Sequence, residues 1–144
     1  MTHNSVTLAV GAVILKDQDV LLIKRGRAPF LGHWSIPGGK VDFGESLETA
    51  LHREIKEETG VTIKTLGLIN AFEALPEHEG DRHFVMIDYA CAYVSGDVRA
   101  GDDAMEAAFF PLPEALSKLA WDKTRQAVQG ALAFTEGNMI ASNL

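Results

Sequence analysis

The 144-residue sequence is short of cysteine and of long apolar runs. Cys91 is the only cysteine, which excludes a disulfide framework and a cysteine-rich zinc site, and its apolar neighbours predict a buried thiol. No stretch approaches the ~18 apolar residues of a membrane-spanning helix, and residues 1–6 lack the pattern of a secretory signal. We therefore expect a cytoplasmic protein without a membrane partner.

Positive charge is also scarce. The sequence has 13 Lys and Arg against 20 Asp and Glu, a formal net charge of -7, and no basic run. Nucleic-acid backbones are bound by clustered Lys and Arg, so we do not expect a nucleic acid as partner. A small phosphorylated ligand remains compatible, because a metal ion or a few cations suffice to bind it. Length and composition fit one globular domain over residues 1–144.

The order of apolar segments predicts an α/β fold. Two apolar runs separated by a polar turn favour a buried hairpin, and the helical periodicities have recognisable ends, with Ser46 as N-cap and Gly60 as stop. We predict strands at 6–15, 20–24, 61–71, 82–94 and 107–112, and helices at 45–59, from Pro113 and at 122–134, with loops at 26–39, 75–81 and 95–103 and a loosely held tail after Glu136. Strands, one helix, strands and terminal helices favour a mixed β-sheet between helices.

The helix predicted at 45–59 carries acidic groups beside its apolar face. At about 100° per residue, three apolar residues form a stripe about 80° wide (Leu47, Leu51 and Ile55). Glu54 and Glu58 fall about 20° on either side of Leu47, and Glu57 lies about 60° beyond Glu54. A solvated acidic face with ion pairs along the helix is one interpretation.

A metal site is the other interpretation of these glutamates. Three crowded carboxylates repel one another, and Lys56 points away from them on the wheel. Oxygen ligands without His or Cys suit a hard cation such as Mg²⁺, Mn²⁺ or Ca²⁺ better than zinc.

A longer motif surrounds the glutamates. Residues 39–61 read GKVDFGESLETALHREIKEETGV: Gly, five residues, Glu, seven residues, Arg-Glu-Ile, one residue, Glu-Glu, one residue, Gly-Val. Agreement with this pattern by chance at one start point is on the order of 10⁻⁹. The segment resembles the Nudix box without a mismatch. The resemblance extends upstream through the WSIPG of residues 34–38 and, more loosely, over the whole chain.

The resemblance implies a Nudix-type α/β/α sandwich and a hydrolase that cleaves a phosphoanhydride bond in a nucleoside diphosphate linked to another moiety. It implies Mg²⁺, with Mn²⁺ as the alternative, and a catalytic, metal-binding set of Glu54, Glu57 and Glu58. The main-chain carbonyl of Gly38 is implied as a further ligand, and Arg53 as the organiser of the carboxylates or a purely structural salt bridge. Structural members of the motif are Gly39, Glu45 and Gly60.

Residues outside the motif are weaker candidates. The family often adds a carboxylate from a distant loop as base or water ligand, and four acids qualify (Asp103, Glu106, Glu77 and Glu79), although each alone also fits a solvated loop charge. Arg25 and Arg27 are candidates for binding the phosphates, with surface charge as the alternative. Trp34 and Phe72 are candidates for stacking on a base, with core packing as the alternative.

The substrate is the least determined feature. Pro76, fifteen residues past Val61, lies near a proline position of an ADP-ribose-cleaving subgroup, and the AGDD of residues 100–103 is similar to small bacterial ADP-ribose pyrophosphatase-like members. A small nucleotide, ADP-ribose first, is therefore the expected substrate. The alternatives are a (d)NTP pyrophosphohydrolase that sanitises the nucleotide pool, a non-catalytic nucleotide-binding regulatory module, and a plain interaction domain. Because the family often dimerises, a homodimer stays open.

Overall fold

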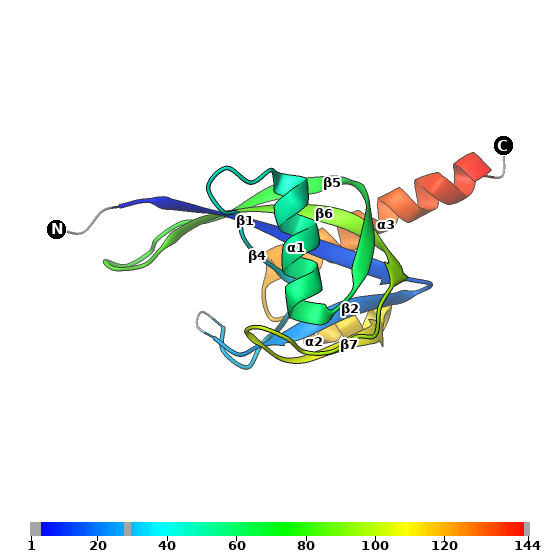
Figure 1. The fold of residues 1–144 in the computed structure, drawn as a ribbon, viewed down its shortest axis with the longest axis horizontal. Helices are drawn as coiled ribbons and strands as arrows, with labels where there is room; N and C mark the ends of the chain where they lie inside the picture. Colours follow the sequence, from blue (N-terminus) through cyan, green and yellow to red (C-terminus); the bar gives the residue numbers. More distant parts are fainter. Residues whose placement is uncertain (1–3, 28–29, 143–144) are drawn as a thin grey trace.

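The computed structural model describes residues 4–27 and 30–142, with side chains described through residue 135. The elements follow one another along the chain as strands, one helix, strands and two helices (Figure 1). Their bounds are β1 (Val6–Lys16), β2 (Asp19–Arg25), β3 (Trp34–Ser35), β4 (Gly38–Lys40), α1 (Leu47–Thr59), β5 (Thr62–Ala74), β6 (His83–Ser95), β7 (Ala104–Pro111), α2 (Leu112–Lys118) and α3 (Asp122–Ser142).

The strands form one mixed sheet. Its main path is β3-β2-β1-β6-β5, with β4 paired to β1 and β7 paired to β2. β1 and β6 run parallel from Val6↔His83 to Leu15↔Ala92, while the other pairs are antiparallel. The predicted mixed sheet and the hairpin of the first two strands are confirmed.

Each face of the sheet carries its own hydrophobic core. β1 is buried on both faces, which explains why its sequence is a nearly continuous apolar run. Alternate β1 residues face α1, in a cluster we call the α1-side core (with Val10, Ala12, Ile14, Leu21, Leu51, Ile55 and Cys91). The other residues face α2 and α3, in the α3-side core (with Val13, Leu15, Leu22, Ile36, Phe72, Ala90 and Val128). The predicted burial of the Cys91 thiol is confirmed.

Ser46 caps the N-terminus of α1 and Gly60 ends the helix, as predicted. The Ser46 hydroxyl accepts a hydrogen bond from the Thr49 N–H at 3.1 Å, and Gly60 adopts φ 76°, where a glycine has no Cβ to clash. The predicted start at Glu45 was wrong, because the helix begins at Leu47. Glu45 stays in the preceding loop, where its carboxylate accepts a hydrogen bond from the Asp42 N–H at 3.0 Å.

Other boundaries also differ from the prediction. The loop predicted at 26–39 contains β3 and the start of β4, two strands of two and three residues that are too short to show a periodicity. β5 continues to Ala74, and the strand predicted at 107–112 begins at Ala104 and ends at Pro111. α3 continues to Ser142 instead of ending at Phe134, so the tail after Glu136 extends this helix.

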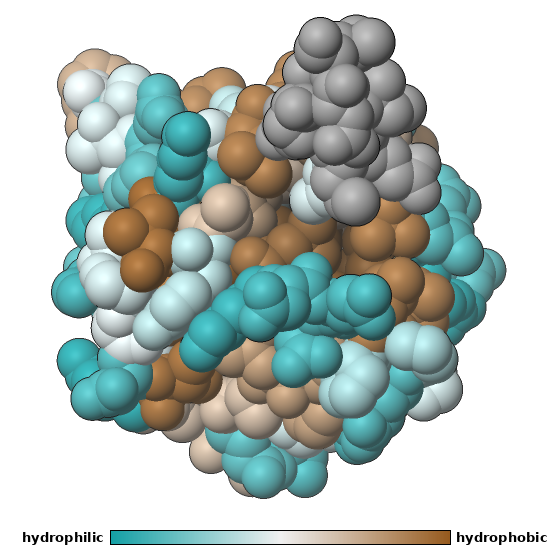
Figure 2. All heavy atoms as spheres, turned by 90° about the vertical axis from the view of Figure 1, so that its right-hand side faces the viewer, coloured by the Kyte–Doolittle hydropathy of each residue, from teal (hydrophilic) through white to brown (hydrophobic). Residues whose placement is uncertain are grey.

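Some large apolar side chains remain exposed. They include Phe43 in the loop before α1 and Leu68 and Val94 on β5 and β6. On the face shown in Figure 2, apolar side chains gather in patches among hydrophilic ones. Within the described residues, no helix is both long and apolar enough to cross a membrane.

Candidate active site

The acidic residues of α1 take up the arrangement that the helical wheel predicts. Leu51 and Ile55 are fully buried in the α1-side core. Glu58 is only 7% exposed, and the side chains of Glu54 and Glu57 are 13% and 48% exposed. The three carboxylates therefore span the boundary between core and solvent on one side of the helix.

Two glycines of β4 let the sheet approach these carboxylates. The Gly38 N–H donates a hydrogen bond to Glu58 Oε1 at 3.0 Å. A Cβ on Gly39 would lie 2.2 Å from Glu54 Oε2, inside van der Waals contact. Only a glycine leaves room for Glu54 at that position.

Arg53 ties the carboxylates together. Its Nε and Nη2 donate to the two carboxylate oxygens of Glu45 at 2.6 and 2.8 Å. Its Nη1 donates to Glu54 Oε1 at 2.8 Å and to Glu57 Oε2 at 3.3 Å, and Nη2 also donates to the Lys40 carbonyl at 3.1 Å. This rigid fork of donors suits the organising role that the resemblance implies.

The hydrogen bonds of Arg53 and the burial of the glutamates shift the pKa values of the carboxyl groups in opposite directions. Hydrogen bonds from Arg53 lower the pKa of Glu45 to about 2, and the same pairing raises the pKa of Arg53. Burial raises the pKa of Glu54, and more strongly that of Glu58, to about 7, although the Gly38 N–H and the charge of Arg25 oppose the rise. The pKa values of two carboxyl groups in this site, Glu45 and Glu58, are thus moved apart by their surroundings.

A set of three carboxylates has the donor chemistry for a divalent cation. Oxygens of Glu54, Glu57 and Asp102 all lie within 4.8 Å of one another. All the donors are carboxylate oxygens, the type that Mg²⁺ and Mn²⁺ prefer. The residues therefore fit such an ion.

Asp102 is the carboxylate that sequence reasoning missed. Its loop is held against the end of α1, because the Gly101 N–H donates to the Glu58 carbonyl at 2.9 Å. Asp102 itself has φ 52°, a conformation that Asp tolerates better than most residues. The signal was the pair of adjacent acids at 102 and 103, of which the prediction named only the second.

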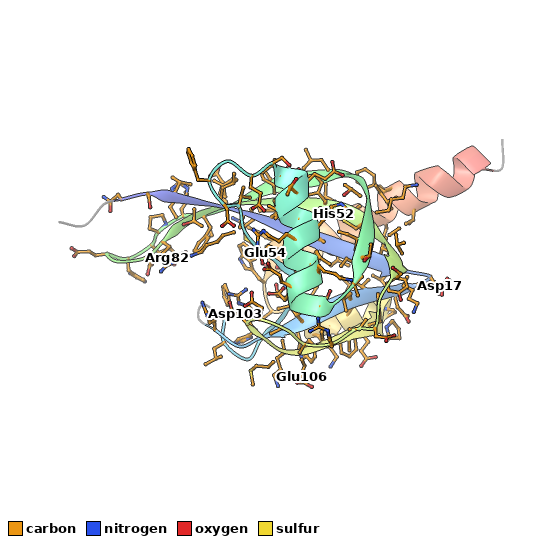
Figure 3. All side chains as sticks on the ribbon, in the orientation of Figure 1. Asp17, His52, Glu54, Arg82, Asp103 and Glu106 are labelled. Carbon is orange, nitrogen blue, oxygen red and sulfur yellow. The ribbon has the colours of Figure 1, made fainter. Side chains whose placement is uncertain are left out.

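The four predicted loop acids are not members of the group that Glu54, Glu57 and Asp102 form. Asp103 forms a salt bridge with Arg27 at 2.7 Å, and Glu106 forms one with Lys24 at 3.4 Å. Glu77 and Glu79 lie in the turn of the β5–β6 hairpin, which projects from the body of the molecule in Figure 1. Figure 3 shows Asp103 on the loop near Glu54 and Glu106 farther away. Among the described residues, the group around Glu54 contains Asp102 and none of these four.

The predicted aromatic contacts are mostly core contacts. Phe72 is 8% exposed within the α3-side core, so the prediction that it stacks on a substrate base does not fit its position. Trp34 is half-buried and packs edge-on against Phe110, with ring centroids 5.1 Å apart. Lys118 Nζ lies 5.3 Å from the Trp34 ring.

A small pocket lies between the β2–β3 loop and the start of α3. It has a volume of about 30 Å³ and is lined by aromatic, polar and basic residues (Arg25, Phe30, His33, Trp34, Ser35, Ala120, Trp121 and Thr124). Phe30 stacks on Trp121 with ring centroids 6.3 Å apart and an angle of 28° between the rings. Of the predicted substrate contacts, Arg25 and Trp34 line this pocket, whereas Arg27 is 70% exposed and paired with Asp103.

Comparison with known proteins agrees with this architecture. The family model described as NUDIX domain matches residues 6–130. ADP-ribose pyrophosphatase of Methanocaldococcus jannaschii is 44% identical over 115 residues, which span 80% of this chain and 67% of that protein. A putative 8-oxo-dGTP diphosphatase of Bacillus subtilis is 37% identical over 91 residues, which span 62% of this chain and 58% of that protein.

A solved structure gives the same result for the fold. The crystal structure of a MutT NUDIX hydrolase from Burkholderia pseudomallei superimposes with a TM-score of 0.75 at 33% identity, covering 88% of this chain and 98% of that one. The α/β fold with a mixed sheet between helices is therefore that of the Nudix hydrolases. The chain belongs to the NUDIX domain family, and the predicted family and enzyme class are confirmed.

Proposed function

We propose that the protein hydrolyses a phosphoanhydride bond in a nucleoside diphosphate linked to another moiety, with ADP-ribose as the first substrate and Mg²⁺ as the ion. The observation that carries this proposal is the convergence of Glu54, Glu57 and Asp102 within 4.8 Å, beside the glycines of β4. Three carboxylates this close require positive charge, and Arg53 reaches two of them. A divalent cation would complete the neutralisation.

Each residue of the site has a defined task in this proposal. Glu54, Glu57 and Asp102 would hold the ion, so Asp102 takes the place of the predicted ligand Glu58, which is outside this group of carboxylates. The ion, when bound, would polarise a phosphate and lower the pKa of a water molecule. Arg53 keeps Glu54 and Glu57 in position, and a glutamate of the motif accepts the proton of the attacking water. The main-chain carbonyl of Gly38 stays a candidate ligand, as the resemblance implies, and the missing Cβ of this residue lets β4 approach the backbone of β1 at Val10.

The pocket beside Trp34 supplies a place for the nucleoside. Arg25 lines this pocket, and its charge also acts on Glu58, so it connects the pocket with the carboxylates. The free volume of about 30 Å³ suffices for a water molecule but not for a base. We propose that a base takes the place of Phe30 on the Trp121 ring, an exchange that the 51% exposure of Phe30 permits.

A substrate panel with Mg²⁺ tests this function. The panel contains ADP-ribose, NADH, sugar nucleotides, dinucleoside polyphosphates, dNTPs and 8-oxo-dGTP, with products identified by mass. We expect ADP-ribose to yield AMP and ribose 5-phosphate, and Glu57→Gln to abolish the reaction. Preference for a (d)NTP would favour the nucleotide-pool alternative, which the similarity to the Bacillus subtilis protein supports. Binding without turnover of any member would overturn hydrolysis and favour a regulatory module.

Four broader expectations belong to the same proposal. We propose that residues 1–144 act as one domain, because two cores share one sheet. The cytoplasmic location and the absence of a nucleic-acid partner stay predictions. The homodimer also stays a prediction. Substitution of the exposed apolar side chains of β5 and β6 would test whether they form its interface.

A further inference from the structure

The carboxylate of Asp102 comes from a loop that has no regular secondary structure. Residues 96–103 connect β6 to β7, and a tight turn ends them, in which the Ala104 N–H donates a hydrogen bond to the Gly101 carbonyl at 3.1 Å. Asp102 is the second residue of this turn and has φ 52°, a conformation that few residues other than glycine adopt. Its carboxylate reaches Glu54 and Glu57 only if neighbouring elements hold the turn in place.

The C-terminal end of α1 is the first element that holds this loop. The Arg99 N–H donates to the Thr59 carbonyl at 3.0 Å, and the Gly101 N–H donates to the Glu58 carbonyl at 2.9 Å. Both carbonyls belong to the last turn of the helix, where no intrahelical N–H is left to bond them. The loop supplies the missing donors and is thereby fixed beside the glutamates of α1.

Gly101 sets the distance between the loop and the helix. A Cβ on Gly101 would lie 2.4 Å from the main-chain carbonyl oxygen of Glu57, which cannot turn aside as the end of a side chain can. Gly101 is not one of the described glycines with a positive φ, so an alanine could adopt its backbone conformation. The close approach to α1 is therefore the feature that requires a glycine at this position.

The end of β2 holds the same turn from the other side. The Gly26 N–H, directly after β2, donates to the main-chain carbonyl of Asp103 at 2.8 Å. A Cβ on Gly26 would lie 2.5 Å from that carbonyl oxygen, and Gly26 also has no positive φ. Figure 3 shows Asp103 on this loop, near Glu54. Asp102 thus lies between two close backbone contacts, one with α1 at Gly101 and one with β2 at Gly26.

We propose that Gly26 and Gly101 are positioning residues that direct the Asp102 carboxylate toward a divalent cation shared with Glu54 and Glu57. This inference rests on the proposed metal site and names the two residues that place its third carboxylate. A Cβ on either glycine would have to move the turn by up to about 1 Å to reach an ordinary contact distance. Mg²⁺ demands near-ideal octahedral geometry, so a displacement of this size weakens its binding.

A double-mutant cycle on metal affinity tests the positioning role without requiring turnover. Binding of Mn²⁺ is followed by the electron paramagnetic resonance signal of the free ion, and binding of Mg²⁺ by calorimetry. Gly26→Ala and Gly101→Ala should each weaken both ions at least about fivefold in the wild-type background. In the Asp102→Asn background, where the carboxylate is already lost, each should weaken them less than about twofold.

Two control variants separate positioning from stability. Gly67→Ala places a Cβ 2.3 Å from the Phe134 ring in the α3-side core, so it should lower the melting temperature without changing the affinity for either ion. Asp103→Asn should also leave the affinity unchanged, because Gly26 bonds the main-chain oxygen of Asp103 and not its side chain.

The outcomes separate this inference from the proposed function. Equal losses of affinity with and without the Asp102 carboxylate would overturn the inference, because the glycines would then act through the fold alone. Unchanged affinity in both alanine variants or in Asp102→Asn, or a wild type that binds neither ion, would overturn it as well. The expected cycle in a protein that turns over no member of the substrate panel would support the inference and overturn hydrolysis alone.

The two glycines also replace each other in the test, because they contact the turn from different elements. If neither alanine variant folds, hydrogen exchange of the wild type decides. Since coupling between two sites is reciprocal, Mg²⁺ should slow exchange at the Gly26 and Gly101 amides at least about twofold. Exchange that Mg²⁺ leaves unchanged at both amides would overturn the inference.

Discussion

Substituting alanine for Gly39 should separate the active site from the stability of the fold. The new Cβ would lie 2.2 Å from Glu54 Oε2 and 2.3 Å from Glu54 Cδ. The atoms that this Cβ meets belong to the end of the flexible Glu54 side chain and not to backbone. The carboxylate of Glu54 can therefore move away while β4 stays in place. An alanine also reduces the freedom of the unfolded chain, a gain of about 0.4–1 kcal/mol that offsets the weakened contact between Arg53 and Glu54, so the melting temperature should change little.

The effect on activity follows from the displacement of Glu54. An ordinary contact needs about 3.4 Å, so the carboxylate must move by about 1 Å, away from Glu57 and Asp102 and out of the fork of Arg53. Misplacement of a catalytic group by about 1 Å can lower the rate about 100-fold. We therefore expect hydrolysis to fall by about two orders of magnitude and the affinity for Mg²⁺ to fall with it.

The neighbouring glycine is the matched control. A Cβ on Gly38 would lie 2.1 Å from the Val10 carbonyl oxygen and 2.8 Å from Gly11 Cα, both backbone atoms of β1. Gly38→Ala should therefore separate β4 from β1 and lower the melting temperature. Thermal unfolding, Mg²⁺ titration and turnover are measured on both variants. Full turnover by Gly39→Ala, or equal loss of stability in the two variants, would refute the placement of Glu54 argued here.

Three further predictions concern single side chains. Arg53→Lys should lower stability by about 1–3 kcal/mol in urea unfolding and reduce turnover, because an ammonium cannot bridge Glu45 and Glu54 as the fork does. Asp102→Asn should weaken Mg²⁺ in calorimetry at least about tenfold, while Asp103→Asn, which loses only its pairing with Arg27, should not. Asp88→Asn should make the free energy of unfolding less dependent on pH. In the wild type, the pKa of the buried Asp88 is about 7 in the folded state and 3.8 ordinarily, and this difference removes about 4 kcal/mol of stability between pH 4 and pH 7.

The sign of the last prediction follows from proton binding. Between pH 4 and pH 7 the folded protein holds the Asp88 proton more tightly than the unfolded chain does. The stability that the Asp88 proton contributes is therefore fully present below the pKa of Asp88 in the unfolded chain. It is lost as the pH rises through the pKa of Asp88 in the folded protein. The free energy of unfolding is compared between the wild type and Asp88→Asn at about pH 4.5 and at about pH 8. The same difference at both pH values would contradict the buried position of Asp88. Equal Mg²⁺ affinities of the Asp102 and Asp103 variants would likewise contradict the grouping of Asp102 with Glu54.

Local geometry accounts for the part of the site that the sequence predicts. Glu54, Glu57 and Glu58 are three or four residues apart or adjacent on one helix, so their positions follow from helical spacing. The N-cap Ser46 and the stop at Gly60 are also local signals. The fork of Arg53 spans only residues 40–57, which lie within the recognisable motif.

The remainder of the site depends on contacts between distant parts of the chain. Asp102 reaches Glu57 only because the loop after β6 hydrogen-bonds to the end of α1, and no periodicity encodes that contact. The pocket joins Trp34 to Trp121 and Thr124, which belong to the opposite end of the sequence. Outside the site, Asp88 lies in an apolar strand that gives no sign of which face it uses until the parallel pairing with β1 is known.

That parallel pairing has a consequence for how the protein is made. β1 leaves the ribosome well before its partner β6 and the Asp102 loop, because β2 to β5 and α1 lie between them in the sequence. Non-local strand pairing of this kind slows folding. Until β6 is synthesised, the edge of the apolar β1 that pairs with β6 stays without a hydrogen-bonding partner. The nascent chain therefore carries its complete glutamate helix well before Asp102 can join it in the proposed metal site, and a chain truncated before β6 should be captured by chaperones and lack that site.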